Sequence, residues 1–287
     1  MTEKNQYYLG VDIGGINLKA VLLDSDLKEV ESYDLATPKD NAEHFLIMLQ
    51  ALIDPLIKIA REKKAQIKGI GVGIPGLYDY KKNKITTLPN LPILNGLNLV
   101  TRLEKKYNLP VKIDNDAHCF VLAEAKMGVA RKYNNIFGLT LGTSVGSGWF
   151  REGEIYHGQH KSFCEIARMV VEAPKNLETL YQNIVKTDAE ELAEKAYRGD
   201  SRAEQDFKNL GYYLGLACAN VVNLLDPEVI VIGGKVTASS DLFFPEIKKI
   251  VTELIMHPEA KNIKILKAKV PGMVGAKGAG LLFDQSN

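Results

Sequence analysis

The stretch "GVDIGGINLKAVLLD", residues 10–24, decides the fold. An apolar run ends at Asp12, a Gly-Gly turn follows, and a second apolar run begins within a few residues. With the run that comes next, the pattern predicts three strands joined by short connections as an antiparallel meander: 7–13, 18–24 and 29–35. Apolar residues at helical spacing then predict a helix over 41–64 with Asn41 as its N-cap, and 67–74 is predicted to be a buried strand. The order β-β-β-α-β indicates a mixed sheet covered by a helix.

The second half of the chain repeats this order. Residues 135–142 and 144–152 predict a β-hairpin, and a helix-rich stretch follows. The strongest helical pattern covers 201–226, with Ser201 as N-cap and Glu204 at the N3 position of a capping box. Three further elements are predicted, a strand over 227–234, a helix over 242–256 and a strand over 263–270, before a final helix over 275–285. The repeated order predicts an α/β protein with two lobes that arose by internal duplication.

Composition excludes several classes of protein. The 287 residues are 46% hydrophobic and 25% charged, with a formal net charge of +1. Nucleic-acid binding is not expected, because phosphate backbones are bound by clustered excess Lys and Arg. The N-terminus lacks the pattern of a signal peptide, and no apolar run is long enough to span a membrane, which takes roughly 18 residues. Three scattered cysteines form no disulfide framework. A cytoplasmic location is therefore expected.

Two glycine-rich hairpins carry the first functional signal. "VDIGGINLK" (11–19) and "LGTSVGSG" (141–148) each place Gly, Ser or Thr between two strands, where exposed backbone N–H groups can bind phosphate oxygens. Each could instead be only a tight turn, but one such hairpin opening each half favours a bound nucleotide. "GVGIPG" (71–76) fits the dinucleotide motif G-x-G-x-x-G, yet Pro75 and the polar residues after it do not open the helix that the motif requires.

Two aspartates are candidates for chemistry. Asp12 ends its strand just before the Gly-Gly turn, where it could hold Mg²⁺ through water. Asp116 stands in "KIDNDAHCF" (112–120), where a strand ends and a helix begins. At that position Asp116 could be only an N-cap, or it could be a catalytic base facing a cleft between the lobes.

Taken together, these pieces closely resemble the ROK family of sugar kinases, within the actin-like ATPase superfamily. The resemblance covers about residues 7–283. It rests on segments in family order: "GVDIGGINLKAVLLD", "GIGVGIPG", "NLP" (90–92), "DNDAH", "LTLGTSVGSG", "CEIARM" and "PEVIVIGG". It implies two ribonuclease-H-like lobes around a cleft that holds ATP and Mg²⁺. The small N-terminal lobe would be 1–114 plus 271–287, and the large lobe 115–270.

The resemblance also implies the roles of individual residues. Asp116 would be the catalytic base that takes the proton of the sugar 6-hydroxyl, and Asp12 would hold Mg²⁺ through water. ATP and its phosphates would be bound by Asp12, Gly14, Gly15, Asn17, Lys19, Gly142, Thr143, Ser144, Gly233 and Gly234. The sugar would be bound by Gly76, Asn90, Asn115, Asp116, Glu165, Arg168 and Glu178.

Two departures from the family pattern stand out. Ile16 occupies a position where the family usually has Thr, so a hydroxyl contact to phosphate is missing. "CEIARM" has Arg168 in place of the His that binds zinc in the family, and the cysteines of the zinc loop are absent. His157, His160 and Cys164 have metal-like spacing, but none falls on a zinc-ligand position, so zinc is not expected. We expect Arg168 to pair with Glu165 or Glu178 and take over part of the scaffolding role of the metal.

The expected function is ATP-dependent phosphorylation of the 6-hydroxyl of a hexose, with glucose as first choice. N-acetylmannosamine, N-acetylglucosamine, mannose and fructose are alternatives within the family. A sugar- or nucleotide-binding protein with weakened catalysis is the alternative from another class, motivated by Ile16 and the missing zinc loop. A ROK transcriptional regulator would carry an added N-terminal helix-turn-helix, and only six residues precede the first predicted strand. A homodimer is one option for the assembly, because dimers are common in the family.

Overall fold

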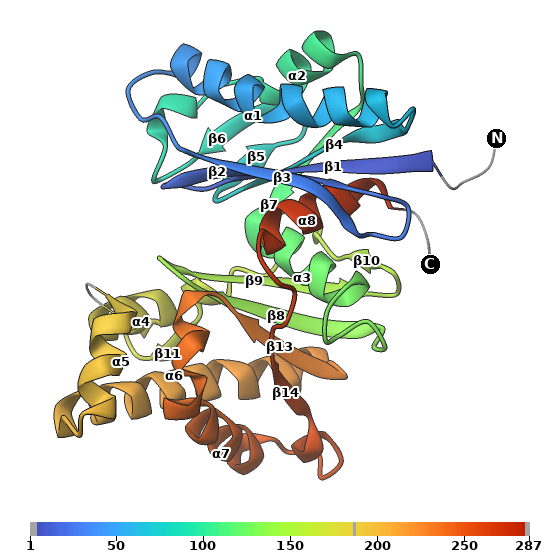
Figure 1. Ribbon diagram of the computed structural model, residues 1–287. Helices are drawn as coiled ribbons and strands as arrows, with labels where there is room; N and C mark the ends of the chain where they lie inside the picture. The colour runs from blue at the N-terminus through green and yellow to red at the C-terminus, as the bar shows by residue number, and fades with distance from the viewer. Residues whose placement is uncertain (1–4, 186–187, 285–287) are drawn as a thin grey trace. The chain divides into compact units, whose positions relative to one another are not determined.

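A computed structural model describes residues 5–185 and 188–284, so the predicted helix over 275–285 and the predicted lobe end at 287 reach beyond the described residues. The chain divides into two compact units, drawn in Figure 1. Unit 1 holds the described residues up to Ala123 and from Val270 onward, and unit 2 holds those from Glu124 to Lys269. In the part of the chain that the structure describes, no helix is long and apolar enough to cross a membrane.

Unit 1 is built on a five-stranded sheet in the order β3-β2-β1-β4-β7. The first three strands pair antiparallel, and β4 and β7 are parallel to β1. The predicted meander and the mixed strand direction are thereby confirmed. The strands are β1 (Gln6–Ile13), β2 (Asn17–Leu23), β3 (Glu29–Ala36), β4 (Gln66–Ile74) and β7 (Val111–Asn115), with a small separate hairpin of β5 (Leu77–Asp79) and β6 (Lys84–Thr87).

Helices cover both faces of this sheet (Figure 1). One face carries α1 (Ala42–Glu62), α2 (Leu99–Tyr107) and the short 3₁₀ turn η2 (Pro92–Leu94), whose apolar residues form one core with the strands. The predicted cap of α1 is confirmed, because the Asn41 side chain accepts a hydrogen bond from the backbone N–H of His44 at 2.9 Å. The other face carries α8 (Val274–Gly280), followed by η6 (Leu281–Phe283).

Two glycines in the strands allow α8 to lie directly on the sheet. A Cβ at Gly10 would overlap the carbonyl oxygen of Ala276, and a Cβ at Gly71 would overlap that of Ala279. Glycine inside a strand commonly marks such a close backbone approach. The C-terminal helix therefore packs backbone against backbone on the strands that lead into the candidate site.

Unit 2 repeats the sheet of unit 1, with strand order β10-β9-β8-β13-β14. Here too three strands pair antiparallel and two follow in parallel, so the predicted hairpin and the duplicated order are confirmed. The strands are β8 (Asn135–Leu141), β9 (Val145–Arg151), β10 (Glu154–Ile155), β13 (Val229–Gly233) and β14 (Lys264–Lys267), with a separate hairpin of β11 (Val170–Glu172) and β12 (Lys175–Asn176).

The core of unit 2 lies between this sheet and a group of helices. The helices are α4 (Leu177–Ile184), α5 (Ala189–Tyr197), α6 (Ser201–Leu225) and α7 (Phe244–Leu254), with short 3₁₀ turns η3 (Ile166–Arg168), η4 (Lys235–Leu242) and η5 (Ala260–Asn262). The long helix was predicted within one residue of its observed end.

The predicted cap of α6 was wrong. Asp200, one residue earlier than Ser201, is the N-cap, and its carboxylate accepts hydrogen bonds from the N–H groups of Arg202 and Ala203 at 2.9 and 3.0 Å. A carboxylate accepts more strongly than a hydroxyl, and it also interacts favourably with the helix dipole. Glu204 consequently stands one position beyond N3, and the capping box does not form.

The unit boundary lies inside helix α3 (Asp116–Lys126), after Ala123, whereas the sequence placed it at residue 114. Most of α3 belongs to unit 1 because it packs against α8. A Cβ at Gly278 of α8 would overlap the carbonyl oxygen of Cys119, so the two helix backbones nearly touch. The sequence signal for a boundary was the strand–helix junction, but the structure carries the chain across by a helix that continues past it.

Candidate active site

Two carboxyl groups form the centre of the candidate site in unit 1. Asp12 lies near the end of β1, and Asp116 is the first residue of α3. Burial, followed by the negative charge of Asp12, raises the pKa of Asp116 to about 7. Burial also raises the pKa of Asp12, which the positive charge of Lys19 partly offsets. A carboxyl with a pKa near neutral can accept a proton at physiological pH, which suits a general base.

The junction that carries Asp116 is held by hydrogen bonds on either side of it. The N–H of Ala117 donates to the side-chain oxygens of Asn115 and Asp116, both at 2.9 Å. Asn115 rather than Asp116 therefore caps α3, because its side chain accepts from the N–H two residues on, and Asp116 is the first residue of the helix. Asn115 also donates from its side chain to the carbonyl oxygen of Gly76 at 3.5 Å, so two predicted sugar residues meet here.

Sequence reasoning missed a buried pair beneath this junction. The carboxylate of Asp114 lies 2.8 Å from Nδ1 of His118, and both side chains are almost fully buried. The pair fixes the first turn of α3 to the end of β7, and the charge of His118 partly offsets the raised pKa of Asp116. An Asp and a His four residues apart across a strand–helix junction is a signal that could have found it.

The first glycine loop is closed by its own backbone. The N–H of Gly14 donates to the carbonyl of Asn17 at 3.0 Å, and the hydroxyl of Thr37 donates to the carbonyl of Gly14 at 2.7 Å. Thr37 is buried and lies 23 residues away, so no local pattern could have predicted this contact. A Cβ at Gly15 would lie 2.9 Å from Cβ of Asn90, which brings a predicted phosphate residue next to a predicted sugar residue.

Ile16 exposes 66% of its surface at the tip of this loop. Its carbonyl accepts a hydrogen bond from the N–H of Thr37 at 2.8 Å, so the backbone of the loop is fixed although Ile16 has no side-chain hydroxyl. The apolar side chain contributes no hydrogen bond to a phosphate. At this position only the backbone N–H could bind a phosphate oxygen.

The second glycine loop, in unit 2, joins β8 to β9 and is held from α4. The hydroxyl of Tyr181 donates to the carbonyl of Gly142 at 2.6 Å, and the side-chain amide of Gln182 donates to the carbonyl of Thr143. Thr143 and Ser144 are exposed at the tip. Side chains of α4 bind both of these loop carbonyls. The loop is therefore held in place without hydrogen bonds from its own hydroxyl groups.

Glu178 and Gly234 lie beside this second loop. The carboxylate of Glu178 accepts from the N–H of Val145 at 3.0 Å and from Gln182 at 2.8 Å. Gly234 follows Gly233, the last residue of β13, and its φ of +96° suits glycine; a Cβ there would overlap the backbone of Leu141. In unit 2, the predicted ATP residues of two separate segments, 142–144 and 233–234, therefore lie close together.

The expected pairing of Arg168 is not seen. Arg168 is exposed, and among the described residues no ion pair of its side chain with Glu165 or Glu178 is found. Glu178 is instead engaged by Val145 and Gln182. The ion pair predicted for Arg168 is therefore not formed in the part of the chain that the structure describes, and the N–H of Val145 is a partner of Glu178 instead. Glu165 is exposed, and its carbonyl accepts from the N–H of Arg168 at 3.0 Å.

Cys164 lies just before Glu165 and is partly buried. Burial raises the pKa of its thiol to about 12. Its carbonyl oxygen accepts a hydrogen bond from the hydroxyl of Ser147. Its φ of +80°, unusual for a residue with a side chain, marks a tight bend just before Glu165.

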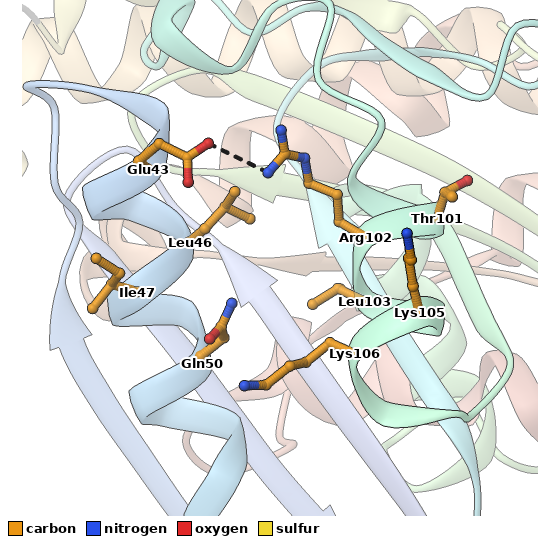
Figure 2. Close-up of a pocket in the computed structure, with 9 residues that line it drawn as sticks. All are labelled: Glu43, Leu46, Ile47, Gln50, Thr101, Arg102, Leu103, Lys105 and Lys106. Atoms are coloured by element: carbon orange, nitrogen blue, oxygen red, sulfur yellow. Dashed lines mark hydrogen bonds and ion pairs between the residues drawn. The ribbon is translucent and has the colours of Figure 1, made fainter.

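A separate hollow of about 530 Å³ lies between α1 and α2 of unit 1 (Figure 2). Leu46, Ile47 and Leu103 form its apolar floor, and an ion pair at 3.3 Å joins Glu43 to Arg102 across it. None of the predicted site residues lines it. This hollow is therefore distinct from the candidate active site.

Comparison with known proteins gives one consistent match. The model of the ROK family matches residues 8–176 and 171–286. An N-acetyl-D-glucosamine kinase of Vibrio cholerae is 28% identical over 308 residues, covering 96% of this chain and 99% of the relative. A glucokinase of Halalkalibacterium halodurans is 28% identical over 317 residues, with 98% and 96% covered. The solved structure of a ROK family glucokinase from Streptomyces griseus, in complex with glucose and AMPPNP, has a TM-score of 0.79 at 21% identity, with 98% and 100% covered.

Proposed function

Since the chain belongs to the ROK family, we propose that it is an ATP-dependent kinase that transfers the γ-phosphate of ATP to the 6-hydroxyl of a hexose. Asp116 carries this proposal. Its carboxyl stands at the start of α3 beside Asp12, with a pKa raised to about 7. Asp116 in its deprotonated form would accept the proton of the sugar hydroxyl as that oxygen attacks phosphorus. A general base of this kind contributes roughly 10²–10⁴-fold to the rate.

The residues of unit 1 fit a magnesium ion. Mg²⁺ prefers oxygen ligands and commonly keeps several waters, and Asp12 is a carboxylate whose burial makes its negative charge costly unless a cation is near. Asp12 would hold the ion through water, and the ion would neutralise charge on the nucleotide phosphates. The N–H groups of Gly15 and Ile16 would bind phosphate oxygens, with Asn17 and Lys19 next to them on β2. Gly14, whose own N–H donates to the carbonyl of Asn17, would shape the loop around the phosphates. In unit 2, Gly142, Thr143, Ser144, Gly233 and Gly234 would bind the nucleotide.

The sugar residues are proposed from the same resemblance. Asn90, Asn115 and Gly76 would bind sugar hydroxyls next to Asp116, and Glu165, Glu178 and Arg168 would do so from unit 2. Glucose is the first choice, and N-acetylglucosamine, N-acetylmannosamine, mannose and fructose are alternatives. Glucokinase and N-acetylglucosamine kinase among the relatives support both kinds of substrate. Without the zinc loop, the pocket around the first two sugar carbons would be formed by protein groups alone.

A sugar- or nucleotide-binding protein with weakened catalysis is the second candidate. The exposed, apolar Ile16 on the first loop favours it, because no side-chain hydroxyl there can bind phosphate. The intact and perturbed pair of Asp12 and Asp116 favours the kinase. Both candidates would bind a ligand, and only the kinase would turn over ATP.

An ADP-release assay on the purified protein with ATP and Mg²⁺ decides between them. The panel comprises glucose, N-acetylglucosamine, N-acetylmannosamine, mannose and fructose. We expect at least one sugar to stimulate ADP release and to appear as its 6-phosphate by phosphorus NMR. Calorimetric binding of a sugar and of ATP without any ADP release would support the binding protein instead. A phosphate found on another hydroxyl would overturn the proposed regiochemistry.

A further inference from the structure

The chain passes between its two units at only two places, after Ala123 and after Lys269. The first passage lies within α3, which begins at Asp116 in unit 1 and ends at Lys126 in unit 2. The second follows β14 and leads into α8. A helix rises about 1.5 Å per residue, so α3 is a stiff rod that links Glu124 to Asp116, eight residues and about 12 Å away.

Glu124 joins the two passages within unit 2. Its side chain is fully buried. Oε1 accepts a hydrogen bond from the N–H of Lys269 at 3.0 Å, and Oε2 accepts one from the N–H of Val129 at 3.0 Å. A buried carboxylate is costly unless its oxygens are hydrogen-bonded, and bonds to a charged group are the strong ones. One side chain thus ties the end of α3 to the last residue of unit 2 before the second passage.

The backbone around Glu124 is built to receive this carboxylate. The chain turns sharply after α3, with the N–H groups of Gly128 and Ala130 both donating to the carbonyl of Glu124 at 3.1 and 3.2 Å. A Cβ at Gly128 would overlap Oε2 of Glu124. Only glycine therefore leaves room for the carboxylate at this point.

The same two passages also meet within unit 1. There the backbone of α8 at Gly278 approaches the carbonyl of Cys119 in α3 so closely that a Cβ would overlap it. At the start of α8, a Cβ on Gly275 would lie 2.7 Å from Oδ2 of Asp12. One passage therefore leads to Asp116 and the other to the neighbourhood of Asp12, the two carboxyls of the candidate site.

We propose that Glu124 is a positioning residue for the reaction: by binding the N–H groups of Lys269 and Val129 it anchors α3, and α3 in turn orients Asp116. This inference rests on the proposed kinase function. Glu124 itself touches no substrate in this role. Loss of the anchor leaves the base present but poorly placed, and small misplacements of reacting groups cost large factors in rate.

The test compares Glu124→Gln with Glu228→Gln. Glutamine keeps the shape of Glu124 but loses its charge and one of its two acceptor oxygens. Glu228 is a matched control in unit 2, because its carboxylate also accepts from two backbone N–H groups, those of Asn134 and Asn135, at 2.6 and 2.8 Å. Glu228 precedes the start of β13, whereas Lys269 follows the end of the parallel strand β14, so the two residues lie at opposite ends of these strands. The readouts are kcat and KM for sugar and ATP, the pH profile of kcat/KM, and amide hydrogen exchange at Val129 and Lys269.

For Glu124→Gln we expect kcat to fall about 10- to 100-fold, with KM for ATP changed less than threefold. The acid limb of kcat/KM should move to lower pH, because a looser α3 lets water reach Asp116. Exchange at Val129 and Lys269 should speed up at least tenfold. Glu228→Gln should leave kcat, the pH profile and both amides unchanged. A Glu124→Gln enzyme with the kcat and pH profile of the wild type would overturn the proposal.

The test also covers two further cases: a variant that does not fold, and a wild-type protein that phosphorylates no sugar. If Glu124→Gln does not fold, Gly128→Ala is used, which crowds Oε2 while the charge remains, and the same loss of kcat is expected. If the wild-type protein phosphorylates no sugar, the proposed function fails, and the inference is judged by hydrogen exchange alone. Unchanged exchange at Lys269 in Glu124→Gln would then overturn the anchor itself.

Discussion

The chemistry assigned to this chain depends on how two neighbouring carboxyls share one environment. Asp116 and Asp12 are both destabilised in their charged forms by burial, and the charge of Asp12 adds to the raised pKa of Asp116. Lys19 acts in the opposite sense on Asp12. The pKa of Asp116 is raised to about 7, so this carboxyl exchanges a proton near neutral pH.

Replacement of Asp116 by Asn should remove most turnover and little else. Asparagine is nearly the same size and can still accept from the N–H of Ala117, but it cannot take a proton. We expect kcat to fall by roughly 10²–10⁴, with the affinity for ATP within a factor of about three, as measured by steady-state kinetics and calorimetry. Asp200→Asn is the control, since it also changes an Asp at a helix start and Asn caps as well as Asp. Turnover of Asp116→Asn near that of the control would contradict the assignment.

The raised pKa of Asp116 also predicts how activity and stability depend on pH. Below about pH 7 the carboxyl is protonated and cannot act as a base, so kcat/KM should fall as pH drops through about 7. The ordinary pKa of an Asp side chain is about 3.9. Between about pH 3.9 and pH 7, the folded state therefore holds a proton on Asp116 that the unfolded state has lost. Stability from this group is therefore fully present below the unfolded value and is lost as pH rises toward 7.

The stability of Asp116→Asn relative to wild type should consequently grow between pH 5 and pH 8. One pKa unit corresponds to about 1.4 kcal/mol, and about two units separate pH 5 from the folded pKa, so we expect a gain on the order of 2–3 kcal/mol, measured by urea unfolding without ligands. An advantage that is the same at both pH values would show that the pKa of Asp116 is not raised.

At this scale the sequence revealed the charged residues better than their partners. Asp12 and Asp116 could be predicted because they follow strands directly. The hydroxyl of Thr37 and the imidazole of His118 could not, since their roles depend on contacts that only the folded chain creates. Arg168 failed for the same reason: the N–H of Val145 supplies the partner of Glu178, and a sequence does not show backbone donors.

At the scale of elements, the glycines in the strands set how closely α8 packs. Gly71→Ala should be strongly destabilising, because its Cβ would overlap the carbonyl of Ala279 and the backbone of α8 would have to move. Overpacking of a tight core typically costs about 1–3 kcal/mol. Denaturant unfolding measures the loss, which shows as a lower midpoint at unchanged slope.

Gly142→Ala is the control for this loss. No heavy atom lies within 4 Å of a Cβ placed at Gly142, so its stability should stay within about 0.5 kcal/mol of wild type. Equal destabilisation by the two variants would mean that general loss of glycine flexibility, and not contact with α8, is responsible.

The helices themselves were easier to predict than their ends. The apolar spacing of α1 and α6 is strong over more than twenty residues, and their lengths were predicted closely. The cap of α6 was missed because Asp200 and Ser201 are both good caps and only the folded chain chooses between them.

At the scale of the molecule, the sequence predicted the architecture because the two halves repeat one order of strands. Both sheets place three antiparallel strands before two parallel ones. The division into units was harder to locate, since α3 runs without a break from one unit into the other. A boundary inside a helix leaves no run of Gly, Pro or polar residues to mark it.

The whole molecule should become more stable when its substrate binds. A ligand that binds only the folded state at 100 times its Kd adds about 2.7 kcal/mol. For a chain of this size that corresponds to a rise in Tm of roughly 5 °C or more. Thermal unfolding with the sugar that stimulates ADP release, and separately with a non-hydrolysable ATP analogue, should each show the rise.

Asp116→Asn should show the rise in Tm with the analogue as well, because that residue acts on the proton of the sugar and not on the nucleotide. A sugar of the panel that gives no turnover should leave Tm unchanged. Turnover without stabilisation by either ligand at saturating concentration would mean that the activity comes from a contaminating kinase and not from this chain.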